Sequence, residues 1–204
     1  MRQAATRELF DYWNRLRRDR AAPERSDIDL VAIRGVLSNV FMLDIDAPHY
    51  FPFVSSGSRV NALFCGQQKG RSFLDLWPKH EAHNITAVLL AVIDAACPVV
   101  IAAGARPEGY READLEVLLL PLRTQGQTQA RILGLMSIAA HRSWLGLLPV
   151  EPFALRSLRA VDEKAVLSGT GGETLLTTWP VRTASQRRDS PKIHGHLRIF
   201  EGGK

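Results

Sequence analysis

Two histidines, His80 and His83, stand three residues apart at the start of a segment with helical periodicity. Residues at this spacing lie on one side of a helix, so both imidazoles could face the same way. With Glu81 or Cys65 as a further ligand they could bind a metal ion, and either histidine could bind haem iron. Two solvated histidines near the start of a helix are the alternative, and the pattern leaves both open.

Other constellations that would indicate catalysis are missing from the sequence. It contains no nucleophile elbow, no phosphate-binding P-loop, no HExxH pair and no dinucleotide-binding glycine motif. Gly169-Thr170-Gly171-Gly172 resembles a phosphate cradle only superficially, because no Lys-Ser/Thr pair follows it. Cys65 and Cys97 stand alone and are interpreted as free thiols of a reducing compartment. The sequence therefore predicts a protein that is not an enzyme.

The charge pattern bears on the kind of partner. The chain has 26 basic and 21 acidic residues, a net charge of +5, and the basic excess lies mainly near the two ends, in residues 15–20 and 182–192. No basic stripe with interleaved aromatic residues runs through the middle, so nucleic acid is not the expected partner. The longest apolar run, residues 85–93, is about half of what a membrane span needs, and the N-terminal residues do not resemble a signal peptide. We expect a cytoplasmic protein without a membrane span.

Large apolar side chains gather in residues 51–77 and in the helical segment that follows. They could fill an ordinary core, or some could line a cavity for an apolar or planar ligand, and the sequence does not separate the two interpretations. The candidate ligand-pocket residues are Phe53, Phe64, Phe73, Trp77 and Leu89.

The periodicity of apolar residues predicts the elements that must position these groups. Helices are expected over residues 6–18, 26–37, 60–64, 73–77, 81–96 and 151–160. Strands are expected over residues 40–45, 50–55, 99–103, 115–122 and 131–139. Because no helix separates the last three strands, we expect an α+β fold with a five-stranded antiparallel sheet and helices on one face. Residues 194–200 could add one short strand, and part of the Thr-, Ser- and Gly-rich tail is expected to be flexible.

The first helix is unusually rich in aromatic residues for a helix near a chain end. Its apolar stripe includes Leu9, Phe10, Trp13 and Leu16. Something must cover this stripe, either the protein's own domain or a partner such as a second copy of the chain. Both alternatives are open, and these four residues are the candidate dimer or partner interface.

Seven short stretches, taken in order, resemble a family of small PAS proteins found in alphaproteobacteria. They are Tyr12-Trp13 with Leu16-Arg17, Pro23 to Asp29, Phe41 to Asp44, Phe51 to Val60, Gly70 to Trp77, Leu120-Pro121-Leu122 and Ile132-Leu133-Gly134. The resemblance spans about residues 8–140. Val54 departs from it, since the family pattern has an arginine there and this chain lacks the corresponding polar group.

The resemblance implies a PAS fold and a sensory or regulatory role, but it supplies no cofactor. On this interpretation residues 1–25 form an N-terminal helix and linker, residues 26–142 the PAS-like domain and residues 143–204 a C-terminal extension, partly flexible. The expected function is ligand binding with output through protein contacts, in a homodimer or with a signalling partner. A ligand-free interaction adaptor and a haem or metal sensor are the alternatives.

Overall fold

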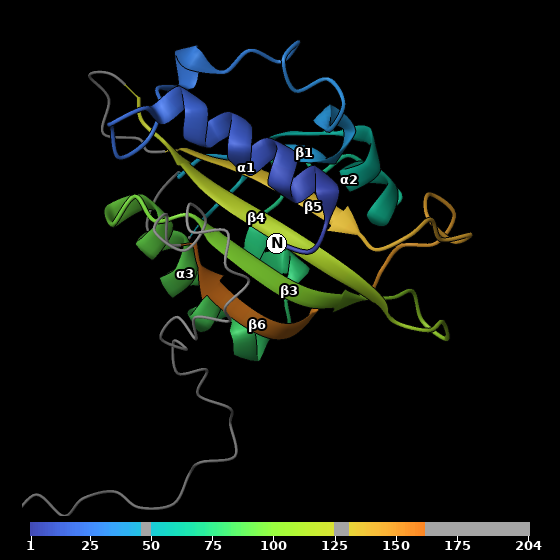
Figure 1. Cartoon of the computed structure of the whole chain (residues 1–204). Helices are drawn as coiled ribbons and strands as arrows, with labels where there is room; N and C mark the ends of the chain where they lie inside the picture. Colours follow the sequence, from blue (N-terminus) through green and yellow to red (C-terminus); the bar gives the residue numbers. More distant parts are fainter. Residues whose placement is uncertain (46–49, 125–130, 162–204) are drawn as a thin grey trace, which may run out of the picture.

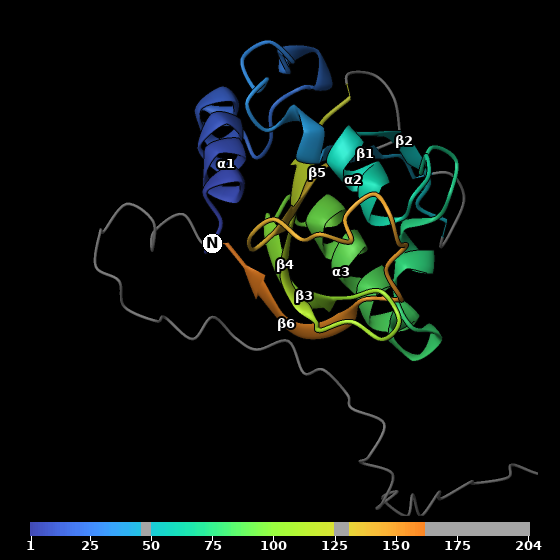
Figure 2. The ribbon, with the colours of Figure 1, turned by 90° about the vertical axis from the view of Figure 1, so that its right-hand side faces the viewer.

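The computed structural model describes residues 1–45, 50–124 and 131–161. They form three layers, with one antiparallel sheet between helices on its two faces (Figure 1). Helix α1 (Ala4–Arg17) lies on one face of the sheet, and α2 (Ser58–Leu63), η3 (Phe73–Leu76) and α3 (Ala82–Asp94) lie on the other (Figure 2). The short 3-10 helices η1 (Arg25–Asp27), η2 (Leu37–Asn39) and η4 (Lys79–Glu81) connect them. The predicted α+β class with an antiparallel sheet is confirmed.

Six strands form the sheet, in the order β2-β1-β5-β4-β3-β6. Their bounds are β1 (Val40–Leu43), β2 (Phe53–Ser56), β3 (Val99–Ala105), β4 (Ala113–Leu122), β5 (Arg131–Ile138) and β6 (Ala154–Ala160). Side chains alternate between the two faces of a strand, so the central strand β4 contributes to two cores. Leu115, Val117 and Leu119 face the α3 side. Leu118, Leu120 and Leu122 face the α1 side.

The sheet has one strand more than the sequence predicted. Residues 151–160 were expected to be helical, but residues 154–160 form strand β6, which pairs with β3. The pairing skips Arg156, since Ala102 lies opposite Ser157 and Ala103 lies opposite Leu155. This bulge brings Leu155 and Leu158 to the same face, where both pack on the core next to α3. An irregular strand can therefore carry the spacing that normally indicates a helix.

The helix expected over residues 26–37 is also absent, and turns with two short 3-10 helices replace it. The backbone of Asp29 is bonded to α1 instead of to its own segment, because Asp29 N–H donates to the Tyr12 hydroxyl at 2.7 Å. Gly35 lies so close to α1 that an added Cβ would be 3.1 Å from a Glu8 carboxylate oxygen. Contacts with α1 thus replace the internal hydrogen bonds of a helix.

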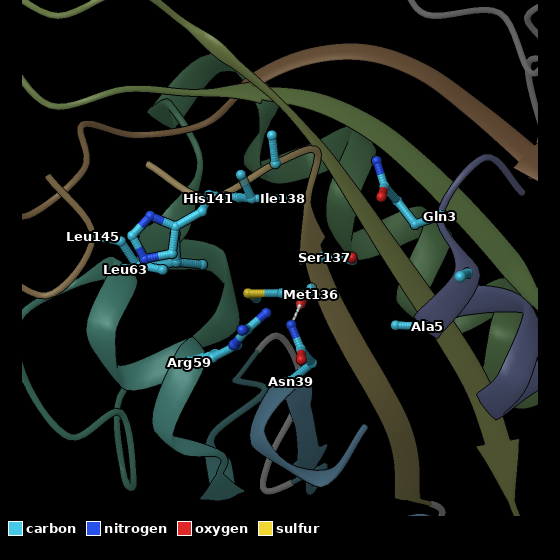
Figure 3. Close-up of a pocket in the computed structure, with 12 residues that line it drawn as sticks. Gln3, Ala5, Asn39, Arg59, Leu63, Met136, Ser137, Ile138, His141 and Leu145 are labelled. Atoms are coloured by element: carbon cyan, nitrogen blue, oxygen red, sulfur yellow. Dashed lines mark hydrogen bonds between the residues drawn. The ribbon is translucent and has the colours of Figure 1, made fainter. Parts of the chain in front are cut away.

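Helix α1 packs its aromatic stripe on its own sheet. Leu9, Phe10 and Trp13 are buried, and Leu16 is partly buried against the same cluster. The indole Nε1 of Trp13 donates to the carbonyl oxygen of Pro121 at 2.9 Å, which fixes the helix over β4. The first turn of α1 lies beside a hollow bordered by α2 and the end of β5 (Figure 3).

The linker after α1 is held by a charged cap. The Asp27 carboxylate accepts hydrogen bonds from the Arg20 guanidinium at 2.7 Å and from the Glu24 backbone N–H at 3.0 Å. The Arg20 hydrogen bond, assisted by the one from the Glu24 backbone, holds the pKa of Asp27 below its ordinary value of 3.8. Because the folded pKa is the lower one, the carboxylate stabilises the fold above the ordinary pKa, and this stability is lost as pH falls through the folded pKa.

We expect Asp27→Asn to lower the free energy of unfolding by about 1 kcal/mol at neutral pH, because one charge-assisted hydrogen bond is weakened in a half-exposed site. The difference from the unsubstituted protein should shrink at an acidic pH below the folded pKa of Asp27, where the carboxyl group is protonated. Urea denaturation at both pH values measures it. Asp19→Asn, in an exposed position, is the control and should change little at either pH.

Several expectations concern residues outside the part that the structure describes. These are the glycine-rich loop at 169–172, the basic residues 182–192, the strand at 194–200 and the flexible tail.

Candidate functional site

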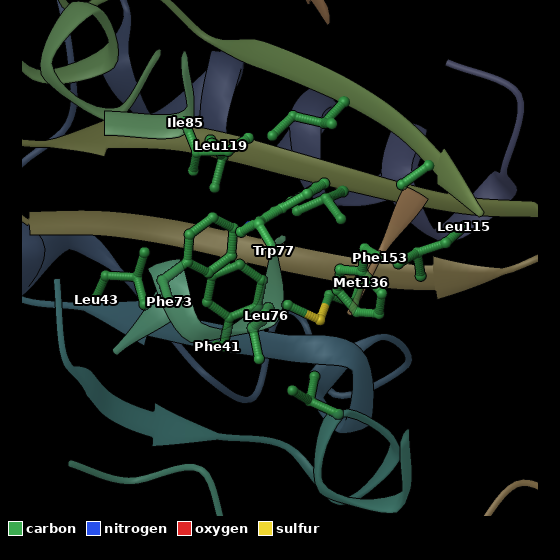
Figure 4. Close-up of a cluster of buried hydrophobic side chains, with 14 of the residues drawn as sticks. Phe41, Leu43, Phe73, Leu76, Trp77, Ile85, Leu115, Leu119, Met136 and Phe153 are labelled. Carbon is green, nitrogen blue, oxygen red and sulfur yellow. The ribbon is translucent and has the colours of Figure 1, made fainter. Parts of the chain in front are cut away.

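An aromatic cluster lies between the sheet and the helical layer (Figure 4). Phe53 of β2 and Phe73 of η3 have ring centroids 6.0 Å apart, and both contact Phe41 of β1, at 5.4 and 5.7 Å. All three rings are buried. Two of the five predicted pocket residues therefore meet here, together with Phe41, which had been expected only as part of a strand.

The cluster continues from Phe73 to the other predicted pocket residues. The Trp77 ring is 6.0 Å from Phe73 and 5.4 Å from Phe153, and Phe153 is 5.7 Å from Phe64. Leu89 of α3 is fully buried in the same core. The structure thus brings all five predicted residues into one region, with Phe64 partly buried at its border.

Local backbone pairing explains why Phe73 and Trp77 point inward. The segment before η3 pairs with β2, since Phe53 N–H donates to Arg71 O and Phe73 N–H donates to Phe51 O, both at 2.9 Å. The Ser72 hydroxyl caps η3 by accepting from Leu74 N–H. Pro78 follows Trp77 and ends the helix, so the two rings stay on the side that faces the sheet.

Residues 144–153, which we call the strap, cross over this helical layer before the chain enters β6. Trp144 and Phe153 anchor it in the core. Its backbone N–H groups donate to neighbouring segments: Gly146 to Ala62 O, Val150 to Leu63 O and Phe153 to Leu76 O, at 2.8–3.0 Å. The strap could hardly be predicted from local sequence patterns, because its hydrogen-bond partners lie about 75 to 90 positions earlier in the chain.

A cavity of about 300 Å³ lies beneath the strap. Six residues line it from the helical layer, namely Phe64, Gln68, Arg71, Ser72, Asp75 and Leu76, and residues 149–152 line it from the strap. Gln68 is 0% exposed, its Nε2 donates to Gly66 O, and its Oε1 has no hydrogen-bond partner among the described residues. The indole Nε1 of Trp77, a residue only 3% exposed, also has none within the part of the chain that the structure describes. A buried acceptor and a buried donor without partners therefore lie in the same layer.

The metal candidates do not come together. His80 and His83 are both exposed, and the His80 Nε2 lies 3.7 Å from a Glu81 carboxylate oxygen. Cys65 is exposed after α2. In residues 1–45, 50–124 and 131–161, no group of three His, Cys, Asp or Glu side chains could hold a metal ion.

The candidate interface residues of α1 are turned toward their own sheet, not toward solvent. Leu9, Phe10 and Trp13 would become available to a partner only if α1 left the sheet. Within the described part of the chain no helix is long and apolar enough to cross a bilayer.

Comparison with known proteins shows to which family this architecture belongs. A family model for the PAS domain matches residues 1–137, which include α1, strands β1 to β4 and all of β5 but its last residue. No curated protein and no solved structure matches the chain. The match confirms the resemblance predicted from the sequence motifs, and the chain belongs to the PAS domain family.

Proposed function

We propose that this protein is a non-enzymatic, cytoplasmic sensor that binds a small molecule in the cavity beneath the strap. Its output passes through protein contacts, in a homodimer or with a signalling partner. Membership of the PAS family supports the sensory or regulatory role, and the aromatic cluster with its adjoining cavity supports the ligand.

The observation that carries the proposal is the buried Oε1 of Gln68, a residue that lines the cavity, because this oxygen has no hydrogen-bond partner among the described residues. Leaving a buried polar group without a hydrogen bond costs about 1–3 kcal/mol, and native proteins rarely tolerate it. A ligand that donates a hydrogen bond to Gln68 removes this cost. An apolar or planar body fits beside Phe64 and Leu76, so the ligand class is a small amphipathic molecule with a donor group.

The strap links this cavity to the rest of the sheet. Its backbone is bonded to Leu63 and Leu76 of the helical layer, and it continues directly into β6 at the sheet edge. A ligand that contacts the strap therefore favours one position of β6 over others. Ligand binding would then shift the populations of the conformations of β6, and a partner that binds one of them more tightly would respond to the ligand.

Native mass spectrometry of the purified protein tests the proposal. We expect a mass excess that denaturation removes, and we expect Gln68→Leu to lose it because the acceptor in the wall is gone. Gln67→Leu is the matched control, since Gln67 is the exposed neighbour, and it should keep the excess. Equal melting temperatures would show that both variants fold.

A bare mass in all three proteins would contradict ligand binding and favour the interaction adaptor. Equal loss of the mass excess in both variants would contradict the assignment to this cavity.

A further inference from the structure

A second cavity of about 300 Å³ lies between the start of α1, helix α2 and the end of β5 (Figure 3). Gln3, Ala4 and Ala5 border it from α1, and Arg59 and Leu63 border it from α2. Met136 to Ile138 at the end of β5, followed by His141 and Leu145, complete the wall. Nothing in the proposed function uses this space.

The polar side of this cavity carries basic groups. The Arg59 side chain extends toward Asn39 and Met136, and His141 lies across the same space (Figure 3). Arg59 is exposed and forms no hydrogen bond or ion pair with the described residues. Among the described residues that line the cavity, none is acidic. Unlike Arg20, which is neutralised by Asp27, Arg59 has its charge available to a ligand.

Part of the remaining wall is apolar. Leu63, Ile138 and Leu145 supply hydrocarbon surface, and the Asn39 side-chain nitrogen is held by the Met136 carbonyl oxygen at 2.8 Å. A cavity with hydrocarbon on one side and a guanidinium on the other suits a ligand with an apolar part and an anionic group. A guanidinium pairs with a carboxylate or a phosphate through two parallel hydrogen bonds. Among the described residues that line this cavity Arg59 is the one with a guanidinium, and its single charge matches the single charge of a carboxylate.

We infer that this cavity binds a small organic carboxylate with a short apolar body. Arg59 binds the carboxylate, His141 lies beside it, and the apolar body contacts Leu63 and Leu145. The site goes beyond the proposed function, because it shares no lining residue with the cavity beneath the strap.

The position of the site couples it to α1. The Glu116 carboxylate of β4 already accepts hydrogen bonds from the backbone N–H groups of Arg2 and Gln3, at 2.8 and 3.3 Å, and so holds the start of the helix on the sheet. A ligand between Ala5 and Arg59 contacts α1 and α2 at once. It therefore favours the docked position of α1 over any undocked one, since it gains these contacts only in the docked state.

The test uses hexanoate as the carboxylate and hexanol as its uncharged match, titrated into the full chain and followed by NMR chemical shifts of backbone amides. We expect saturable shifts at Ala4, Ala5 and Leu63 with hexanoate and none there with hexanol. Arg59→Gln should weaken hexanoate binding about tenfold, because one charge-assisted pair is lost. Arg34→Gln, at an exposed arginine away from this cavity, should leave the affinity unchanged.

Equal affinities of the Arg59→Gln and Arg34→Gln proteins would overturn the assignment, and so would equal binding of hexanol. Gln68→Leu separates this site from the cavity beneath the strap: it should leave the hexanoate shifts intact, and their loss would place the carboxylate elsewhere. Amide exchange in α1 should slow with hexanoate if the ligand holds the helix docked, and unchanged exchange would overturn the coupling.

Discussion

Replacing Gly134 by alanine should lower the free energy of unfolding by about 3 kcal/mol, the upper range for overpacking a core. Gly134 of β5 lies opposite Phe41 of β1, and a Cβ at this position would be 2.1 Å from the Phe41 ring. The ring cannot move aside easily, because it also contacts Phe53 and Phe73. Urea denaturation measures the loss. Gly66→Ala, where the nearest atom to the new Cβ is 3.8 Å away, is the control and should change stability little.

A double-mutant cycle shows whether the ring is the cause. Phe41→Ala alone should cost about 3–5 kcal/mol, the usual range for removing a buried aromatic ring. In that background Gly134→Ala should cost little or even stabilise, since the space is free and alanine suits a strand better than glycine. Additive losses would contradict the argument and would mean that Gly134 is needed for its backbone alone.

Gly134 also shows what the sequence could and could not predict. The motif Ile132-Leu133-Gly134 helped to identify the family, yet the reason for the glycine lies in Phe41, more than 90 residues earlier. Local patterns were sufficient for α3, whose apolar residues recur with the period of a helix, and for β4, which is a short and nearly continuous apolar run. They were misleading for β6, where a bulge gave a strand the spacing of a helix.

The candidate site was also predictable only where it depends on residues that are close together in the sequence. Phe53, Phe64, Phe73, Trp77 and Leu89 could be named from the sequence, because large apolar residues close together in a chain tend to share a core. Gln68 could not, because its burial depends on the strap, which crosses the helical layer from a distant part of the sequence. Arg59 and His141 were missed because two isolated basic residues acquire meaning only when the fold places them around one cavity.

The strap should matter for stability as well as for the cavity. The match to the PAS domain ends at residue 137, yet Phe153 is 0% exposed and contacts both Trp77 and Phe64. Phe153→Ala should therefore lower the free energy of unfolding by about 3–5 kcal/mol, since it leaves a void where the helical layer meets the sheet. Urea denaturation followed by tryptophan fluorescence measures the effect, and Trp77 lies next to the substitution.

Leu147→Ala is the matched control, because Leu147 belongs to the same strap but is 75% exposed. It should change the free energy of unfolding by less than about 0.5 kcal/mol. If Phe153→Ala costs no more than this control, the strap is not docked in solution and the cavity beneath it is not enclosed. If the large difference is found, residues 144–160 fold as one unit with the PAS domain, and a ligand that moves the strap must also move the β3–β6 edge of the sheet.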